Sequence, residues 1–299
     1  MSQSITDAVR EGYGGVARQG LGSHQDGVRS VANAFGYSDD ELSSIPDEAN
    51  MGLSCGNPVA MASLREGETV VDLGSGGGLD VFLASAQVGP AGTAIGIDMT
   101  GDMISLARAN AAKGGYDNVR FYLAEIEAMP IPSNSVDCVI SNCVLNLCED
   151  KDAALREVFR ILKPGGRLAI SDIALKQALP PELAEQVAAW TGCIGGAINI
   201  ADNRAKLFAT GFSDVAIIDS EADLNAYKEA ASAACCAPAP SQQAPASDGC
   251  CAAAGESMDQ SAAFHDQVSG LLEAYDVNEY AASVKMFAVK PLSEGAAEG

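Results

Sequence analysis

One short stretch, residues 70–80 with the sequence VVDLGSGGGLD, most constrains the fold of this chain. Apolar residues interrupted only by Asp72 lead into a cluster of glycines, and an apolar run typical of a helix start follows. We therefore predict a strand, a tight glycine turn and a helix. Glycines allow the positive φ angles of such a turn and let the backbone approach a ligand, which meets the free N–H groups of the helix start. We expect an adenosine-like ligand on this loop.

The turn differs from two common nucleotide-binding loops. A dinucleotide-binding turn has the pattern G-x-G-x-x-G, and a P-loop ends in Gly-Lys-Ser/Thr. Here the loop contains no lysine, and Asp72 precedes the first glycine by two residues. The stretch resembles the first motif of Rossmann-like methyltransferases, which implies S-adenosyl-L-methionine as the cofactor and Asp72, Gly74, Ser75 and Gly76 among its contacts. A turn whose glycines serve packing alone is the alternative.

Strand-like and helix-like segments alternate after this turn. We expect helices near residues 79–88, 101–112 and 150–161, a turn at 163–166, and strands at about 92–98, 118–123, 136–141 and 167–171. The alternation predicts βαβ units and a parallel sheet with right-handed crossovers. Strands at 215–218 and 283–289, the latter antiparallel at the sheet edge, complete a seven-stranded, mostly parallel sheet of the α/β, Rossmann-like class.

The chain divides into three expected parts. Residues 1–49 form a helical and loop segment on the core, residues 50–175 the cofactor-binding core, and residues 176–299 a substrate-side region that completes the sheet. Within the last part, residues 230–255 have a composition that predicts disorder. This insert carries two Cys-Cys pairs, Cys235-Cys236 and Cys250-Cys251, which either capture a thiophilic metalloid or belong to a tolerated surface insertion.

Ligands of parallel sheets bind at the carboxyl ends of the strands. Asp98 ends the second strand, where an acidic side chain reaches a ribose diol, and Met99 follows it. An exposed aspartate that caps the next helix is the alternative for Asp98. Ile126 and Glu127 follow the third strand, where similar methyltransferases hold adenine. Asn142 ends the fourth strand and faces the methyl group.

Charge and cysteine content restrict the function. The 40 acidic residues outnumber the 18 basic ones, and the net charge of −22 disfavours nucleic acid and anionic membranes as partners. Since no apolar stretch approaches 18 residues, a cytoplasmic location is expected. Because the cytoplasm keeps thiols reduced, the nine cysteines are not expected to form stabilising disulfides. With two histidines and no C-x-x-C spacing, a zinc catalytic centre is not expected.

Several motifs narrow the resemblance to the arsenite methyltransferase family. They are residues 72–80, 96–100, 141–147, 162–166 and 192–197, together with 52–58 and 275–284. The resemblance covers residues 10–292 except the insert. It implies methyl transfer to thiolate-bound As(III) in arsenic detoxification, with arsenite or its thiol conjugates as substrate. It also implies a thiol reductant such as glutathione or thioredoxin, and a monomer.

The same resemblance assigns the cysteines. Cys143 and Cys193 are the implied metalloid-binding pair, and Cys55 is the third thiol, either a further ligand or a reductant of the oxidised product. Soft thiolates suit trivalent arsenic, which has its own lone pair and needs no general base. Cys138, inside an apolar strand, is expected to be a buried small hydrophobe, and the same applies to Cys148.

One departure from the family concerns the partner of Cys55. Many relatives carry an N-terminal cysteine that pairs with its counterpart, but residues 1–54 contain no cysteine. The reductive step must therefore use another partner or an external thiol. Two other functions stay open: a carbon or oxygen methyltransferase of a quinone- or sterol-like molecule, and a non-catalytic metalloid-sequestering protein.

Overall fold

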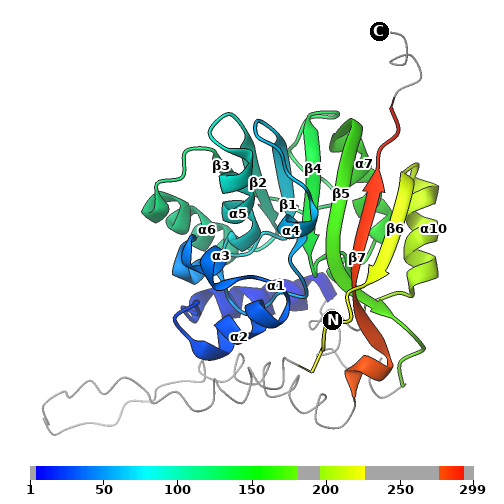
Figure 1. Ribbon diagram of the computed structural model, residues 1–299, viewed down its shortest axis with the longest axis horizontal. Coiled ribbons are helices and arrows are strands. Elements are labelled where there is room, and N and C mark those ends of the chain that lie inside the picture. The colour runs from blue at the N-terminus through cyan, green and yellow to red at the C-terminus, as the bar shows by residue number, and fades with distance from the viewer. Residues whose placement is uncertain (1–4, 181–195, 226–275, 293–299) are drawn as a thin grey trace, which may run out of the picture.

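The computed structural model describes residues 5–180, 196–225 and 276–292. A seven-stranded sheet with the order β3-β2-β1-β4-β5-β7-β6 organises these residues (Figure 1). The strands are β1 (Thr69–Leu73), β2 (Thr93–Asp98), β3 (Val119–Leu123), β4 (Val136–Asn142), β5 (Leu162–Leu175), β6 (Ser213–Asp219) and β7 (Ala281–Val289). Neighbours among β1 to β5 all pair in parallel. The predicted α/β class and seven-stranded, mostly parallel sheet are confirmed.

Strand β7 supplies the antiparallel pairing at this edge of the sheet. It lies between β5 and β6 and runs antiparallel to both. The prediction that the 283–289 strand lies at the edge is therefore wrong in position, because β6 is the outermost strand. Nine residue pairs join β5 to β7, from Arg167 with Val289 to Leu175 with Ala281. A late segment of the chain is therefore built into the sheet beside β5.

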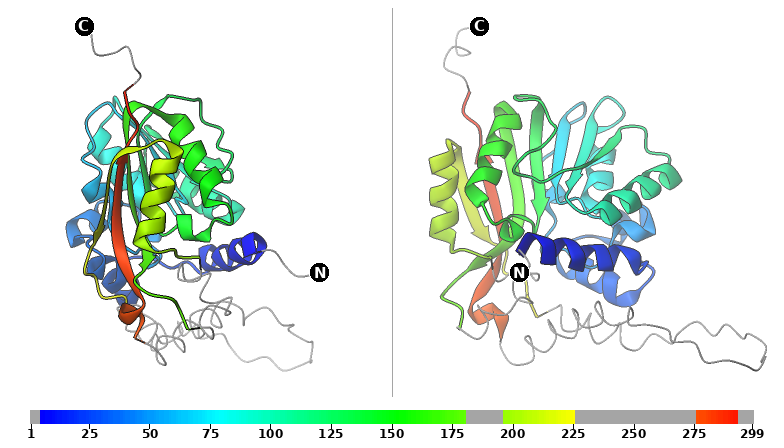
Figure 2. Two further views of the ribbon diagram at one scale, coloured as in Figure 1. Left: turned by 90° about the vertical axis from the view of Figure 1, so that its right-hand side faces the viewer. Right: turned by 180° about the vertical axis from the view of Figure 1, so that it is seen from behind.

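Helices cover both faces of the sheet. One apolar core contains residues of α3 (Asp39–Ser43), α4 (Pro58–Met61), α5 (Leu79–Val88) and α6 (Gly101–Gly114). The other contains residues of α7 (Lys151–Ile161) and α10 (Ile200–Thr210). Helices α1 (Ile5–Arg18) and α2 (Asp26–Ala34) lie instead at the carboxyl ends of the parallel strands (Figure 2). Short 3-10 turns are η1 (Asp47–Ala49), η2 (Leu145–Leu147) and η3 (Val277–Glu279).

The predicted element bounds hold within a few residues except at 163–166. There the structure continues β5 through the expected turn, with a register shift against β4. The N–H of Gly165 donates to the carbonyl of Lys290, and the N–H of Lys290 donates to Gly166. These bonds to the residue after β7 tie the glycine segment to the sheet. Gly165 keeps a left-handed φ of 79°, so the turn-forming residues make an irregularity in the strand.

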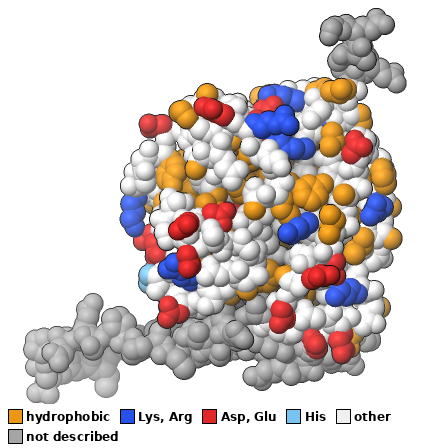
Figure 3. Space-filling view, in the orientation of Figure 1, with side chains coloured by type: hydrophobic (Ala, Val, Ile, Leu, Met, Phe, Trp, Pro, Cys, Tyr) orange, Lys and Arg blue, Asp and Glu red, His pale blue; other side chains and the backbone are white. Residues whose placement is uncertain are grey.

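Some predictions fall on residues outside the described ranges. They are Cys193 and the insert with its paired cysteines. The division into three parts also remains a prediction. Among the described residues, no helix has the length and apolar character needed to span a bilayer. Acidic and basic side chains are interspersed over the face in Figure 3.

Candidate functional site

The glycine turn between β1 and α5 has the predicted backbone. Gly74, Gly76 and Gly78 adopt φ angles of 66°, 50° and 99°, which favour glycine. The hydroxyl of Ser75 is buried in this turn without a hydrogen-bond partner. Because a buried polar group is normally paired, Ser75 marks a place where a ligand group fits.

Three buried carboxyl groups surround the turn. Asp98 accepts hydrogen bonds from the N–H groups of Gly76 (3.0 Å) and Thr100 (2.8 Å). It is 9% exposed, so the exposed capping role does not describe it. Burial raises the pKa values of Asp72 and Asp98, and raises that of Asp80 to about 6. Carboxyl groups held this way favour a cationic ligand, which would restore their charged form.

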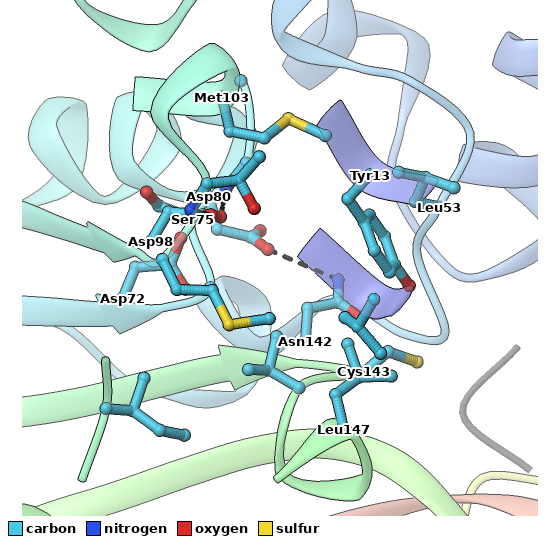
Figure 4. Close-up of a pocket in the computed structure, with 18 of the residues that line it drawn as sticks. Tyr13, Leu53, Asp72, Ser75, Asp80, Asp98, Met103, Asn142, Cys143 and Leu147 are labelled. Carbon is cyan, nitrogen blue, oxygen red and sulfur yellow. Dashed lines mark hydrogen bonds between the residues drawn. The ribbon is translucent and has the colours of Figure 1, made fainter. Parts of the chain in front are cut away.

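All the residues predicted to contact the cofactor line one cavity. They are Asp72, Gly74, Ser75, Gly76, Asp98, Met99, Ile126, Glu127 and Asn142. Figure 4 shows the carboxyl groups on one side of this cavity and Tyr13 and Leu53 on another, with Cys143 near Leu147 at the edge. The sequence prediction therefore selected residues that lie together, although their contact with a cofactor remains a prediction.

Helix α1 lies along one side of the cavity. Its residues Thr6, Val9 and Tyr13 line the cavity. At the rim, Arg10 pairs with Glu125 at 3.2 Å, and the Thr6 hydroxyl donates to Glu149 at 3.0 Å. Arg18 pairs with Asp102 on α6. The helix thus forms part of the cavity wall and is held there by polar contacts.

Two of the three predicted thiol residues meet at this cavity. Cys143, at the end of β4, lines it, and Cys55 is joined to Cys143 as a disulfide with a Cα–Cα separation of 5.9 Å. Cys143 adopts a φ of 59°, unusual for a residue with a side chain. The partner of Cys55 therefore lies within the chain. Among the described residues, no cluster of three His, Cys, Asp or Glu side chains could hold a metal ion.

The remaining described cysteines differ from this pair. Cys138 is fully buried in the core, as predicted, and burial raises its thiol pKa to about 12. Cys148 is buried too and also lines the cavity. Burial raises the pKa of Cys148 far above its usual range, so this thiol stays neutral near pH 7. A neutral thiol is a poor ligand for a soft cation.

Sequence reasoning did not include three residues of the site. Tyr37 donates a 2.7 Å hydrogen bond to Asp80, which lines the cavity, and Tyr13 faces the cavity from α1. The spacing of Val9, Tyr13 and Val16 is helical and provided a signal for α1. Asp80 lies in the first turn of a helix, where an acidic residue is common for electrostatic reasons alone.

The sequence matches a known family over more than half its length. Residues 64–231 fit the family model described as a methyltransferase domain. An arsenite methyltransferase of Halobacterium salinarum is 42% identical over 230 residues, covering 72% of this chain and 59% of that protein. An arsenite methyltransferase of Aquipseudomonas alcaligenes is 34% identical, covering 59% of this chain and 52% of that protein. The chain therefore spans less than two thirds of the length of these relatives.

Solved structures share the fold. An arsenic (III) S-adenosylmethionine methyltransferase from Chlamydomonas reinhardtii superimposes with a TM-score of 0.55 at 25% identity, covering 88% of this chain and 74% of that one. A phosphoethanolamine N-methyltransferase of Haemonchus contortus with S-adenosyl-L-methionine gives a TM-score of 0.62 at 15% identity, covering 88% and 56%. The match of the family model to residues 64–231, more than half of the chain, shows that the chain belongs to the methyltransferase domain family, and the solved structures agree with its fold.

Proposed function

We propose that this protein is an S-adenosylmethionine-dependent arsenite methyltransferase. One observation supports the choice of acceptor above all: the sulfurs of Cys55 and Cys143 meet at the edge of the cavity lined by the predicted cofactor residues. A carbon or oxygen acceptor has no need of a thiol pair there. The curated relatives named above have the same activity in their names.

The cavity suits the proposed cofactor. The Ser75 hydroxyl, which has no hydrogen-bond partner among the described residues, offers a polar contact, and Asp98 offers an acceptor for a ribose. Ile126 and Met99 provide apolar surface for adenine. The buried carboxyl groups of Asp72 and Asp80 favour the positive charge of a sulfonium and an ammonium group. When bound, S-adenosylmethionine supplies an electrophilic methyl group.

The protein's contribution is mainly to hold the acceptor in place. In the reduced state, the thiolates of Cys55 and Cys143 bind As(III), the latter residue lining the cavity. Because arsenic carries its own lone pair, no general base of the chain would be required, and S-adenosylmethionine would supply the methyl group and leave as S-adenosylhomocysteine. Positioning the two reactants together can lower the barrier by several kcal/mol. Helix α1 supplies Thr6, Val9 and Tyr13 to the wall of the same cavity.

The pair must be reduced before it binds arsenic. A thiol such as glutathione or thioredoxin supplies two electrons to the Cys55–Cys143 disulfide. Methylation oxidises arsenic formally from the trivalent to the pentavalent state, so a further round needs two more electrons from the same class of reductant. Cys193, which the family resemblance pairs with Cys143 as a metalloid ligand, lies outside the described residues and remains a proposed arsenic ligand. A cytoplasmic monomer remains the proposed form.

The test is a product assay with purified protein, S-adenosylmethionine, arsenite and a thiol reductant, read by mass spectrometry. We expect methylated arsenic from the wild type and from Cys138→Ala, a control on the same strand, and none from Cys143→Ser. Full activity of Cys143→Ser would refute the thiolate mechanism. No product from any of the proteins, with cofactor binding intact, would indicate a carbon or oxygen acceptor.

A further inference from the structure

The Cys55–Gly56 segment lies against the sheet with both polar groups of the Cys55 backbone engaged. The N–H of Cys55 donates to the side-chain Oδ1 of Asn142 at 2.9 Å. Its carbonyl accepts from the hydroxyl of Ser283 at 2.6 Å. Asn142 ends β4 and Ser283 lies in β7, so two strands hold one residue from opposite sides of its backbone.

The amide nitrogen of Asn142 also bonds to the Cys55–Gly56 segment. Its Nδ2 donates to the carbonyl of Gly56 at 2.7 Å and to the hydroxyl of Tyr37 at 2.9 Å. A weaker contact of 3.3 Å reaches Asp80, as the dashed line in Figure 4 shows. The Asn142 side chain therefore bonds to both Cys55 and Gly56, although its sequence position suggested a contact with the cofactor.

The residue after Asn142 is Cys143 itself. Its N–H donates to the Ser171 carbonyl of β5 at 2.8 Å, which fixes its backbone to the same sheet. Two consecutive residues at the end of β4 therefore contact Cys55: the Asn142 side chain accepts a hydrogen bond from its backbone N–H, and the Cys143 sulfur bonds to its sulfur. The sequence separation of the two cysteines is 88 residues, so this local arrangement must come from the fold.

We propose that Asn142 and Ser283 are positioning residues that set the geometry of the Cys55–Cys143 thiol pair through the backbone of Cys55. The inference rests on the proposed function only in taking this pair as the thiols that hold arsenic. Ser283 lies outside the cavity lining, and its buried hydroxyl bonds directly to Cys55. It therefore acts on the thiol pair without a contact to the cofactor.

The test measures the thiol pair itself, without arsenic or cofactor. The full chain is equilibrated in glutathione buffers, where the Cys55–Cys143 disulfide and two glutathione thiols exchange with two cysteine thiols and one glutathione disulfide. Alkylation and peptide mass spectrometry then give the fraction of this disulfide. Its equilibrium constant reports how closely the fold holds the two sulfurs together.

We expect Asn142→Ala and Ser283→Ala each to reduce the equilibrium constant for the disulfide by about three- to tenfold, since each removes one buried hydrogen bond from Cys55. Ser85→Ala also removes a hydrogen bond of a buried hydroxyl, to Asn118, but touches neither Asn142 nor Ser283, and should stay within about twofold of the wild type on the same scale. If Asn142→Ala does not fold, Ser283→Ala decides alone.

Capture of phenylarsine oxide, which binds two thiols at once, gives a second measurement on the reduced proteins. Affinity for this probe should fall in the same two variants and stay unchanged in Ser85→Ala. Unchanged disulfide equilibria in folded Asn142→Ala and Ser283→Ala would overturn the proposal, as would an equal shift in Ser85→Ala. A wild type that shows this behaviour yet makes no methylated arsenic would contradict the proposed function alone.

Discussion

Gly56 packs so closely on β5 that a single added methyl group should displace the Cys55 segment. A Cβ at Gly56 would lie 2.5 Å from the Ser171 Oγ and 2.7 Å from the Ser171 Cβ. Ser171 is fully buried in β5, between β4 and β7, so its short side chain has no space to move. The substitution Gly56→Ala must therefore shift the segment by about 1 Å to reach ordinary contact distance.

The magnitude follows from two opposing effects. Overpacking of this kind costs about 1–3 kcal/mol. The φ of Gly56 lies outside the left-handed region, so alanine also lowers the entropy of the unfolded chain and returns about 0.4–1 kcal/mol. Gly56→Ala should then destabilise the protein by about 1–2 kcal/mol in urea unfolding and weaken the Cys55–Cys143 disulfide equilibrium, because Cys55 moves with Gly56.

Ser171→Gly provides the matched control, since it removes both atoms that the new methyl group would meet. Alone it should cost about 0.5–1 kcal/mol, the usual cost of glycine in a strand. The double variant Gly56→Ala/Ser171→Gly should regain most of the stability that Gly56→Ala loses, with a stabilising coupling free energy of about 1–2 kcal/mol in the double-mutant cycle. Additive effects, or a Gly56→Ala protein as stable as the wild type, would refute the steric reasoning.

Two further predictions concern the carboxyl groups of the cavity and the end of α7. Because burial raises the pKa of Asp80 to about 6, this group is protonated in the free protein at lower pH and must lose its proton to face a cation. The affinity for S-adenosylmethionine, measured by calorimetry, should thus fall as the pH drops below 6, by up to about tenfold per pH unit. The affinity for S-adenosylhomocysteine, which lacks the sulfonium charge, should fall less steeply. The same dependence of affinity on pH for both ligands would contradict this prediction. Lys290 donates to Asn134 and to the carbonyls of Phe159 and Leu162 at 2.7–2.8 Å. Lys290→Met should lower the free energy of unfolding by about 1–2 kcal/mol, and a change under about 0.5 kcal/mol would exclude this capping role.

Local patterns explain most of what the sequence predicted correctly. The strand, glycine turn and helix around Gly74 are determined by residues next to one another, and so is the βα alternation through β5. Because the carboxyl ends of parallel strands meet at one edge of a sheet, the order of the strands is enough to place Asp98, Ile126 and Asn142 around a common cavity.

Long-range pairing explains what the sequence did not predict. Nothing near Ser283 indicates that its hydroxyl meets the carbonyl of Cys55, because the two are 228 residues apart in the chain. The continuation of β5 through Gly165 depends likewise on Lys290. The buried Asn142 amide has four protein partners, and a pattern of neighbouring residues cannot show which of them its nitrogen meets.

The insertion of β7 between β5 and β6 has a consequence for how the protein is made. On the ribosome, β5 and β6 both emerge before the strand that joins them, and each has an unpaired edge until β7 arrives. Ser283 arrives with that strand, so the second hold on Cys55 forms only as the sheet is completed. The Cys55–Cys143 pair therefore reaches its final geometry only after the rest of the fold has been translated. In a nascent chain stalled before β7, the backbone of Cys55 would lack its hydrogen bond to Ser283.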